Sequence, residues 1–96
     1  MDIILDGSQI REAYDFHRIL SEKLDFGPYY GNNMAALWDR LTTDVERPLR
    51  LIWRNAGASK AAMGAEVFDK IVQLLHDVET QDVEFGRNER FTFRCE

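Results

Sequence analysis

Ninety-six residues, 45% of them hydrophobic and 30% charged, suit one small globular core, and we expect a single domain spanning residues 1–96. No apolar run approaches the roughly 18 residues needed to cross a bilayer, and the single cysteine, Cys95, excludes an internal disulfide and fits a cytoplasmic protein. The net charge of −5 argues against direct nucleic-acid binding, which requires a basic patch.

The first half of the chain predicts one strand and two helices. Residues 3–5 form a short apolar run that is closed by a turn signal, which indicates a buried strand. Apolar residues recur at helical spacing over residues 12–24, with Tyr14 widening the stripe. A loop over residues 25–31 follows, and Asn32 or Asn33 then caps a second helix that must end before Pro48.

The second half predicts two further strands with helices between them. Residues 49–54 and 91–95 alternate as strands do, and a long helix is expected from about 65 to 80, with Val67 among its inward residues. Ser59 is expected to cap a short helical segment over residues 60–63. Residues 82–89 remain ambiguous between a hairpin that starts at Val83 and a loop.

Strands separated by helices pair in parallel through right-handed crossovers. We therefore expect an α/β fold, a compact domain in which a three-stranded parallel sheet packs with three to four helices.

The acidic excess lies entirely in the first half of the chain. Residues 1–46 hold nine acids and four bases, a net charge of −5, whereas residues 47–96 hold eight of each. Within the second helix, Ala35, Asp39, Thr42 and Glu46 share one face, away from the apolar stripe that contains Trp38. A mostly polar acidic face of this kind suits a cationic partner, although a charge of −5 also simply keeps a small protein soluble.

The sequence shows no catalytic machinery. It contains no metal-ligand, nucleophile-elbow or phosphate-loop motif, so we expect no enzyme, no catalytic residue, no cofactor and no metal. His17 is interpreted as a structural histidine, and His76, beside Asp77, as a solvated residue. Tyr29 and Tyr30 suit either an interface or the rim of the core.

Residues 7–60 resemble the barstar family, the intracellular inhibitors of barnase-type secreted ribonucleases. The most specific matches are Tyr29-Tyr30-Gly31 with Asn33, followed by Ala36-Leu37-Trp38-Asp39. The resemblance implies a three-stranded parallel sheet and a loop and second helix that plug a ribonuclease active site. Asp39 would take the place of the RNA phosphate, and Arg47-Pro48 would be a cis peptide.

The chain also departs from the family pattern. Ala35 replaces an aspartate and Asp44 replaces a tryptophan, whereas Asp77 is the counterpart of an interfacial glutamate on the long helix. We therefore expect an inhibitor of a basic secreted ribonuclease whose flanking contacts differ. The predicted partner-binding residues are Tyr29, Tyr30, Gly31, Asn33, Ala35, Trp38, Asp39, Thr42, Asp44, Glu46 and Asp77.

Two other functions remain open from the sequence. The first is an interaction or regulatory module of the same fold that binds a different cationic protein rather than a nuclease. The second is a small enzyme that uses Asp39 and His76, which requires the two side chains to share one cleft.

Overall fold

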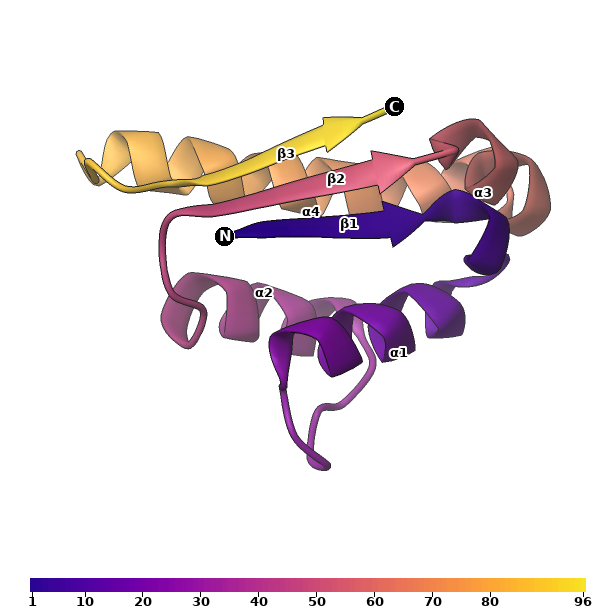
Figure 1. The fold of residues 1–96 in the computed structure, drawn as a ribbon, viewed down its shortest axis with the longest axis horizontal. Helices are drawn as coiled ribbons and strands as arrows, with labels where there is room; N and C mark the ends of the chain where they lie inside the picture. The colour runs from indigo at the N-terminus through magenta and orange to yellow at the C-terminus, as the bar shows by residue number, and fades with distance from the viewer.

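The computed structural model describes residues 1–96 and confirms the predicted α/β fold (Figure 1). Three parallel strands form one sheet in the order β1-β2-β3, so β2 is central. In Figure 1 the strands lie side by side, with α4 behind them and α1 and α2 below. The elements in chain order are β1 (Asp2–Asp6), a 3-10 turn η1 (Gly7–Gln9), α1 (Ala13–Leu24), α2 (Met34–Thr43), β2 (Leu49–Arg54), α3 (Ala56–Met63), α4 (Ala65–Glu84) and β3 (Phe91–Cys95).

The core lies on one face of the sheet. The paired residues Ile3, Leu51 and Phe93 are buried there with apolar side chains of α1, α2 and α4. The opposite face carries surface ion pairs such as Arg50 with Asp2. Ile4 points to this uncovered face and is 40% exposed, so the prediction that the whole 3–5 run is buried was wrong. Helices cover only one face, which imposes alternating burial on the edge strand.

Two apolar residues that were expected to face inward lie on the surface. Tyr14 of α1 is 54% exposed and Val67 of α4 is 39% exposed. Both line a shallow groove that also contains Met34 and Ile71. The apolar arcs of α1 and α4 are wider than the part of each helix that the core covers, and the side chains at the margins remain in solvent.

The turn after β2 is fixed by a close backbone approach. A Cβ atom on Gly7 would lie 2.1 Å from the Asn55 carbonyl oxygen, so only glycine fits there. The Ser59 hydroxyl donates to the Gly7 carbonyl (2.9 Å) and accepts from Trp53 Nε1 (3.0 Å). Ser59 is therefore a buried residue within α3, which begins at Ala56, and the prediction that it caps a shorter helix was wrong.

The ambiguous segment after residue 80 begins as helix. α4 continues to Glu84, and no hairpin starts at Val83. Asp82 is fully buried at an inward position of α4, where protein donors satisfy its carboxylate. These donors make it possible for an acidic residue to extend the core-facing stripe.

Candidate functional site

The two tyrosines of the loop before α2 have opposite environments. Tyr29 is 92% exposed, whereas Tyr30 is only 6% exposed. The Tyr30 hydroxyl lies 2.7 Å from His17 Nδ1 on α1. The Tyr30 ring packs on the Phe26 ring, with 4.9 Å between the two ring centroids. The ring of Tyr30 is therefore part of the core and supports the loop from beneath, and the expectation that Tyr30 contacts a partner stays a prediction.

Burial changes the acid–base properties of this buried pair. It raises the pKa of Tyr30 well above its ordinary value, and the nearby Arg40 charge offsets only part of this effect. Burial also lowers the pKa of His17, because the imidazolium form would lose its hydration. The expectation that His17 is structural is confirmed, since it is buried and bonded to Tyr30.

Asn33 connects the loop to the start of α2. Its Oδ1 accepts a hydrogen bond from the Ala36 backbone N–H (2.8 Å), as expected for an N-cap, and its Nδ2 donates to the Gly31 carbonyl (3.2 Å). A Cβ atom on Gly31 would lie 3.0 Å from Asn33 Nδ2. Gly31 and Asn33 thus form one compact turn that sets the direction in which α2 leaves the loop.

The solvent side of α2 presents one carboxylate without an internal partner. Asp39 is exposed, and only its backbone carbonyl is engaged, by the hydroxyls of Thr42 and Thr43. Ala35, one turn before it, is also exposed. Asp39 is therefore available to an external cation without first losing an ion pair.

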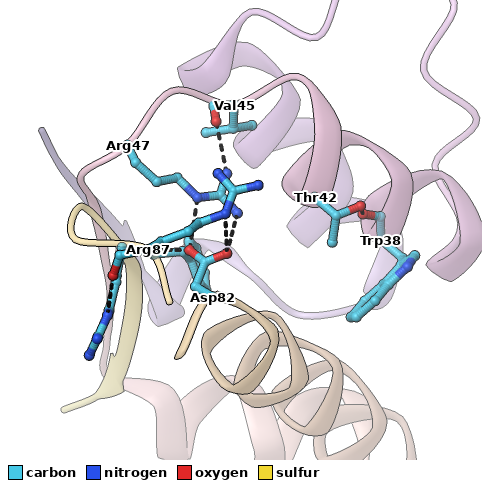
Figure 2. Close-up of polar contacts among 8 residues, drawn as sticks. Trp38, Thr42, Val45, Arg47, Asp82 and Arg87 are labelled. Carbon is cyan, nitrogen blue, oxygen red and sulfur yellow. Dashed lines mark hydrogen bonds and ion pairs between the residues drawn. The ribbon is translucent and has the colours of Figure 1, made fainter. Parts of the chain in front are cut away.

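Trp38 and Thr42 lie at the boundary between this surface and the core, and both are half-buried. The Thr42 hydroxyl donates to the Trp38 carbonyl at 2.7 Å (Figure 2). Trp38 therefore has the mixed position that the sequence left open, with part of its ring against the core and part in solvent.

The remaining acidic candidates are more distant or already paired. The Asp44 carboxylate lies 3.6 Å from Arg40 Nε, and Glu46 is exposed beyond the end of α2. On α4, which packs beside α2, Asp77 accepts a hydrogen bond from Gln73 Nε2 at 2.9 Å. The site thus consists of the Asp39 carboxylate on α2, with Asp44, Glu46 and Asp77 as further acidic groups at the end of α2 and on α4.

Neither histidine forms a catalytic arrangement with Asp39. His76 Nδ1 lies 2.7 Å from Glu79 Oε1, and its ring packs edge-on against Phe93 of β3. Glu79 in turn accepts a hydrogen bond from the Phe93 backbone N–H. No group of three histidine, cysteine, aspartate or glutamate residues is arranged to hold a metal ion, and no helix is both long and apolar enough to cross a membrane.

The sequence interpretation missed a buried ionic cluster beside the C-terminal end of α2 (Figure 2). Arg47 Nε and Nη2 contact the two oxygens of Asp82 at 2.9 and 3.2 Å, and the backbone N–H of Phe91 donates to the same carboxylate at 2.7 Å. Arg87 Nε lies 3.5 Å away. Asp82 follows Leu75 and Val78 on the buried stripe, and an acid in that register is the signal that could have revealed the cluster.

The cluster determines the charge state of Asp82. Burial by itself would raise the pKa of this carboxyl, but the hydrogen bonds from Arg47 and Phe91, with the charges of Arg47 and Arg87, hold it below its ordinary value. Asp82 is therefore ionised at neutral pH, although its side chain is inaccessible to solvent. The Arg47-Pro48 peptide that follows α2 is cis, as the resemblance implied.

Comparisons with known proteins agree with this architecture. A family model described as "Barstar (barnase inhibitor)" matches residues 1–96. A Bacillus subtilis protein, "Putative ribonuclease inhibitor YrdF", is 35% identical over 79 residues, which cover 82% of this chain and 86% of the relative. Both similarities point to an inhibitor rather than an enzyme.

Proposed function

This chain belongs to the barstar family, and on that premise we propose that it is an intracellular inhibitor of a barnase-type ribonuclease. The loop at Tyr29 to Gly31 and the outer face of α2 would occupy the active site of the enzyme. The observation that carries the proposal is the exposed Asp39 carboxylate, which has no internal partner and projects from a helix that is fixed at both ends.

A ribonuclease active site is cationic, because it must bind the phosphates of RNA. A carboxylate that enters such a site replaces its lost hydration with several charge-assisted hydrogen bonds. Asp39 loses no internal ion pair in doing so, whereas Asp44 would have to leave or share Arg40. Asp39 is therefore the proposed phosphate mimic, and Asp44 and Glu46 are proposed to contribute to the long-range attraction.

The exposed groups around Asp39 supply the rest of the proposed contact surface. Tyr29 offers a large exposed ring, and Trp38 and Thr42 border the carboxylate. Asn33 and Gly31 fix the turn that places Tyr29 and α2 relative to one another. Ala35 and Asp44 replace an aspartate and a tryptophan of the family pattern, so we propose that the target enzyme differs from barnase opposite these two residues. Asp77 on α4 is proposed as an outer contact.

The proposal is tested by titrating a barnase-type ribonuclease with the wild-type chain and with Asp39→Ala. Losing a carboxylate with charge-assisted hydrogen bonds, at about 1.5–3 kcal/mol each, should weaken inhibition by about 100-fold or more. Asp69→Ala is the control, because it removes the same charge from an exposed site on α4, where the carboxylate lies 3.4 Å from Lys60 Nζ. Added salt should weaken the wild-type complex.

Full ribonuclease activity at micromolar inhibitor, or equal effects of the two substitutions, would contradict the proposal. Recovery of a stable partner that is not a nuclease from the source cell would instead favour the alternative of an interaction module.

A further inference from the structure

The side chain of Arg47 ties the segment that follows α2 to the buried carboxylate of Asp82. Arg47 Nη1 donates to the Val45 carbonyl at 2.8 Å, while Nε and Nη2 contact both oxygens of Asp82. One guanidinium thus joins the segment that follows α2 to the buried end of α4 (Figure 2). Through the Phe91 backbone N–H, the same carboxylate also joins the start of β3.

We infer that Arg47, anchored by Asp82, is a positioning residue for the inhibitory face of α2. This inference rests on the proposed function, because it assigns Arg47 an effect on binding through Asp39. Arg47 is 5% exposed in its side chain, so it acts on a partner only through the helix that it holds.

The chemistry of the pair favours positioning over simple stabilisation. A buried ion pair contributes little net stability, because the desolvation of both charges offsets their attraction. The guanidinium is a rigid planar fork that can bind a carboxylate with two donors and keep a third free. Arg47 uses all three directions, which defines where the Val45 carbonyl lies relative to Asp82.

The position of the helix end matters to Asp39 because the two are mechanically connected. Asp39 lies four residues before Thr43, the last residue of α2, about 6 Å along the helix axis at roughly 1.5 Å per residue, and Val45 follows two residues after that end. The hydroxyls of Thr42 and Thr43 bond back to carbonyls of the preceding turn, so the last turn moves with the turn that carries Asp39. Hydrogen bonds tolerate only about 0.5 Å in donor–acceptor distance, so a shift of that size at the carboxylate would weaken its contacts.

The chain contains a matched control for this role. Arg87 contacts the same Asp82 carboxylate, at 3.5 Å, but makes no hydrogen bond to the exit of α2 and is 41% exposed in its side chain. Lysine at either position preserves the positive charge beside Asp82 and removes the planar fork. Arg47→Lys and Arg87→Lys therefore separate the positioning of α2 from the neutralisation of Asp82.

The first test is a double-mutant cycle measured as the Kd for a barnase-type ribonuclease. Arg47→Lys should weaken binding about tenfold when Asp39 is present and by less than about threefold in the Asp39→Ala background, because coupled residues do not add. Arg87→Lys should leave Kd within about twofold in both backgrounds. An equal effect of Arg47→Lys in the two backgrounds would overturn the inference.

The second test needs no partner and separates this inference from the proposed function. Amide hydrogen exchange of the free protein should become about tenfold faster in the last turn of α2 on Arg47→Lys, without the same change in β2. Arg87→Lys should leave the α2 exchange unchanged. Unchanged α2 protection in Arg47→Lys would overturn the positioning role even if the wild-type chain binds the nuclease. A wild-type chain that fails to bind, with faster α2 exchange in Arg47→Lys, would overturn the proposed function and leave Arg47 only as a residue that holds α2.

Discussion

Removing the Tyr30 hydroxyl should destabilise the fold, although the ring that remains packs in the same place. The hydroxyl lies 2.7 Å from His17 Nδ1 in a buried environment, so Tyr30→Phe leaves that nitrogen without its partner. A net hydrogen bond contributes about 0.5–1.5 kcal/mol, and an orphaned buried polar atom costs about 1–3 kcal/mol. We therefore expect a loss of about 1–2 kcal/mol in the free energy of unfolding, while the packing on Phe26 is kept.

Tyr29→Phe is the control, because this neighbouring hydroxyl belongs to a side chain that is 92% exposed. Urea denaturation at neutral pH should show a change within about 0.5 kcal/mol for Tyr29→Phe and an unchanged m-value for both variants. Tyr29→Ala should instead weaken binding to a ribonuclease with little effect on unfolding. Equal stability losses for Tyr29→Phe and Tyr30→Phe would refute the assignment of Tyr30 as the buried support.

Two further predictions concern stability. Burial lowers the pKa of His17, so below about pH 6.5 the unfolded chain binds a proton that the native state does not, and the free energy of unfolding should fall as the pH falls below that value. His17→Asn keeps a polar group near Tyr30 but does not titrate, so urea titrations of this variant should show a smaller decline. The same decline in the variant and the wild type would contradict this assignment to His17. Gly7→Ala should lower the free energy of unfolding by at least about 2–3 kcal/mol, because the added Cβ atom clashes with the Asn55 carbonyl. Gly57→Ala in α3 places its Cβ atom more than 4 Å from any other atom and should raise the free energy of unfolding by about 0.5–1 kcal/mol. Equal changes in melting temperature for the two variants would contradict the close approach at Gly7.

The predicted elements were mostly correct because their signals are local. The alternation over residues 49–54 predicted β2, and of the two expected caps, Asn32 and Asn33, the structure has Asn33 at the start of α2. The end of α4 was placed too early because the sequence alone gives Asp82 no partner. Its partners are Arg47, 35 residues earlier, and the Phe91 backbone N–H, nine residues later.

In the candidate site, too, local sequence signals predicted part of the arrangement and tertiary contacts decided the rest. Helical spacing placed Asp39 on the polar side of α2, and the structure shows it exposed and without an internal partner. Periodicity carried no information about the loop, where adjacent tyrosines have opposite environments. Only tertiary packing decides which ring enters the core, because it places the Tyr30 hydroxyl beside His17 of α1 and the Tyr30 ring against Phe26 at the start of the loop.

The sequence by itself determined the α/β class, the parallel sheet and the acidic face of α2, because periodicity, turn residues and charge act over a few neighbouring positions. Tertiary structure alone decided that Tyr30 is buried, that Ser59 joins Trp53 to Gly7, and that Asp82 anchors Arg47. Each of these depends on a buried polar group finding its partner in a distant segment, and the cost of leaving such a group unpaired selects the arrangement.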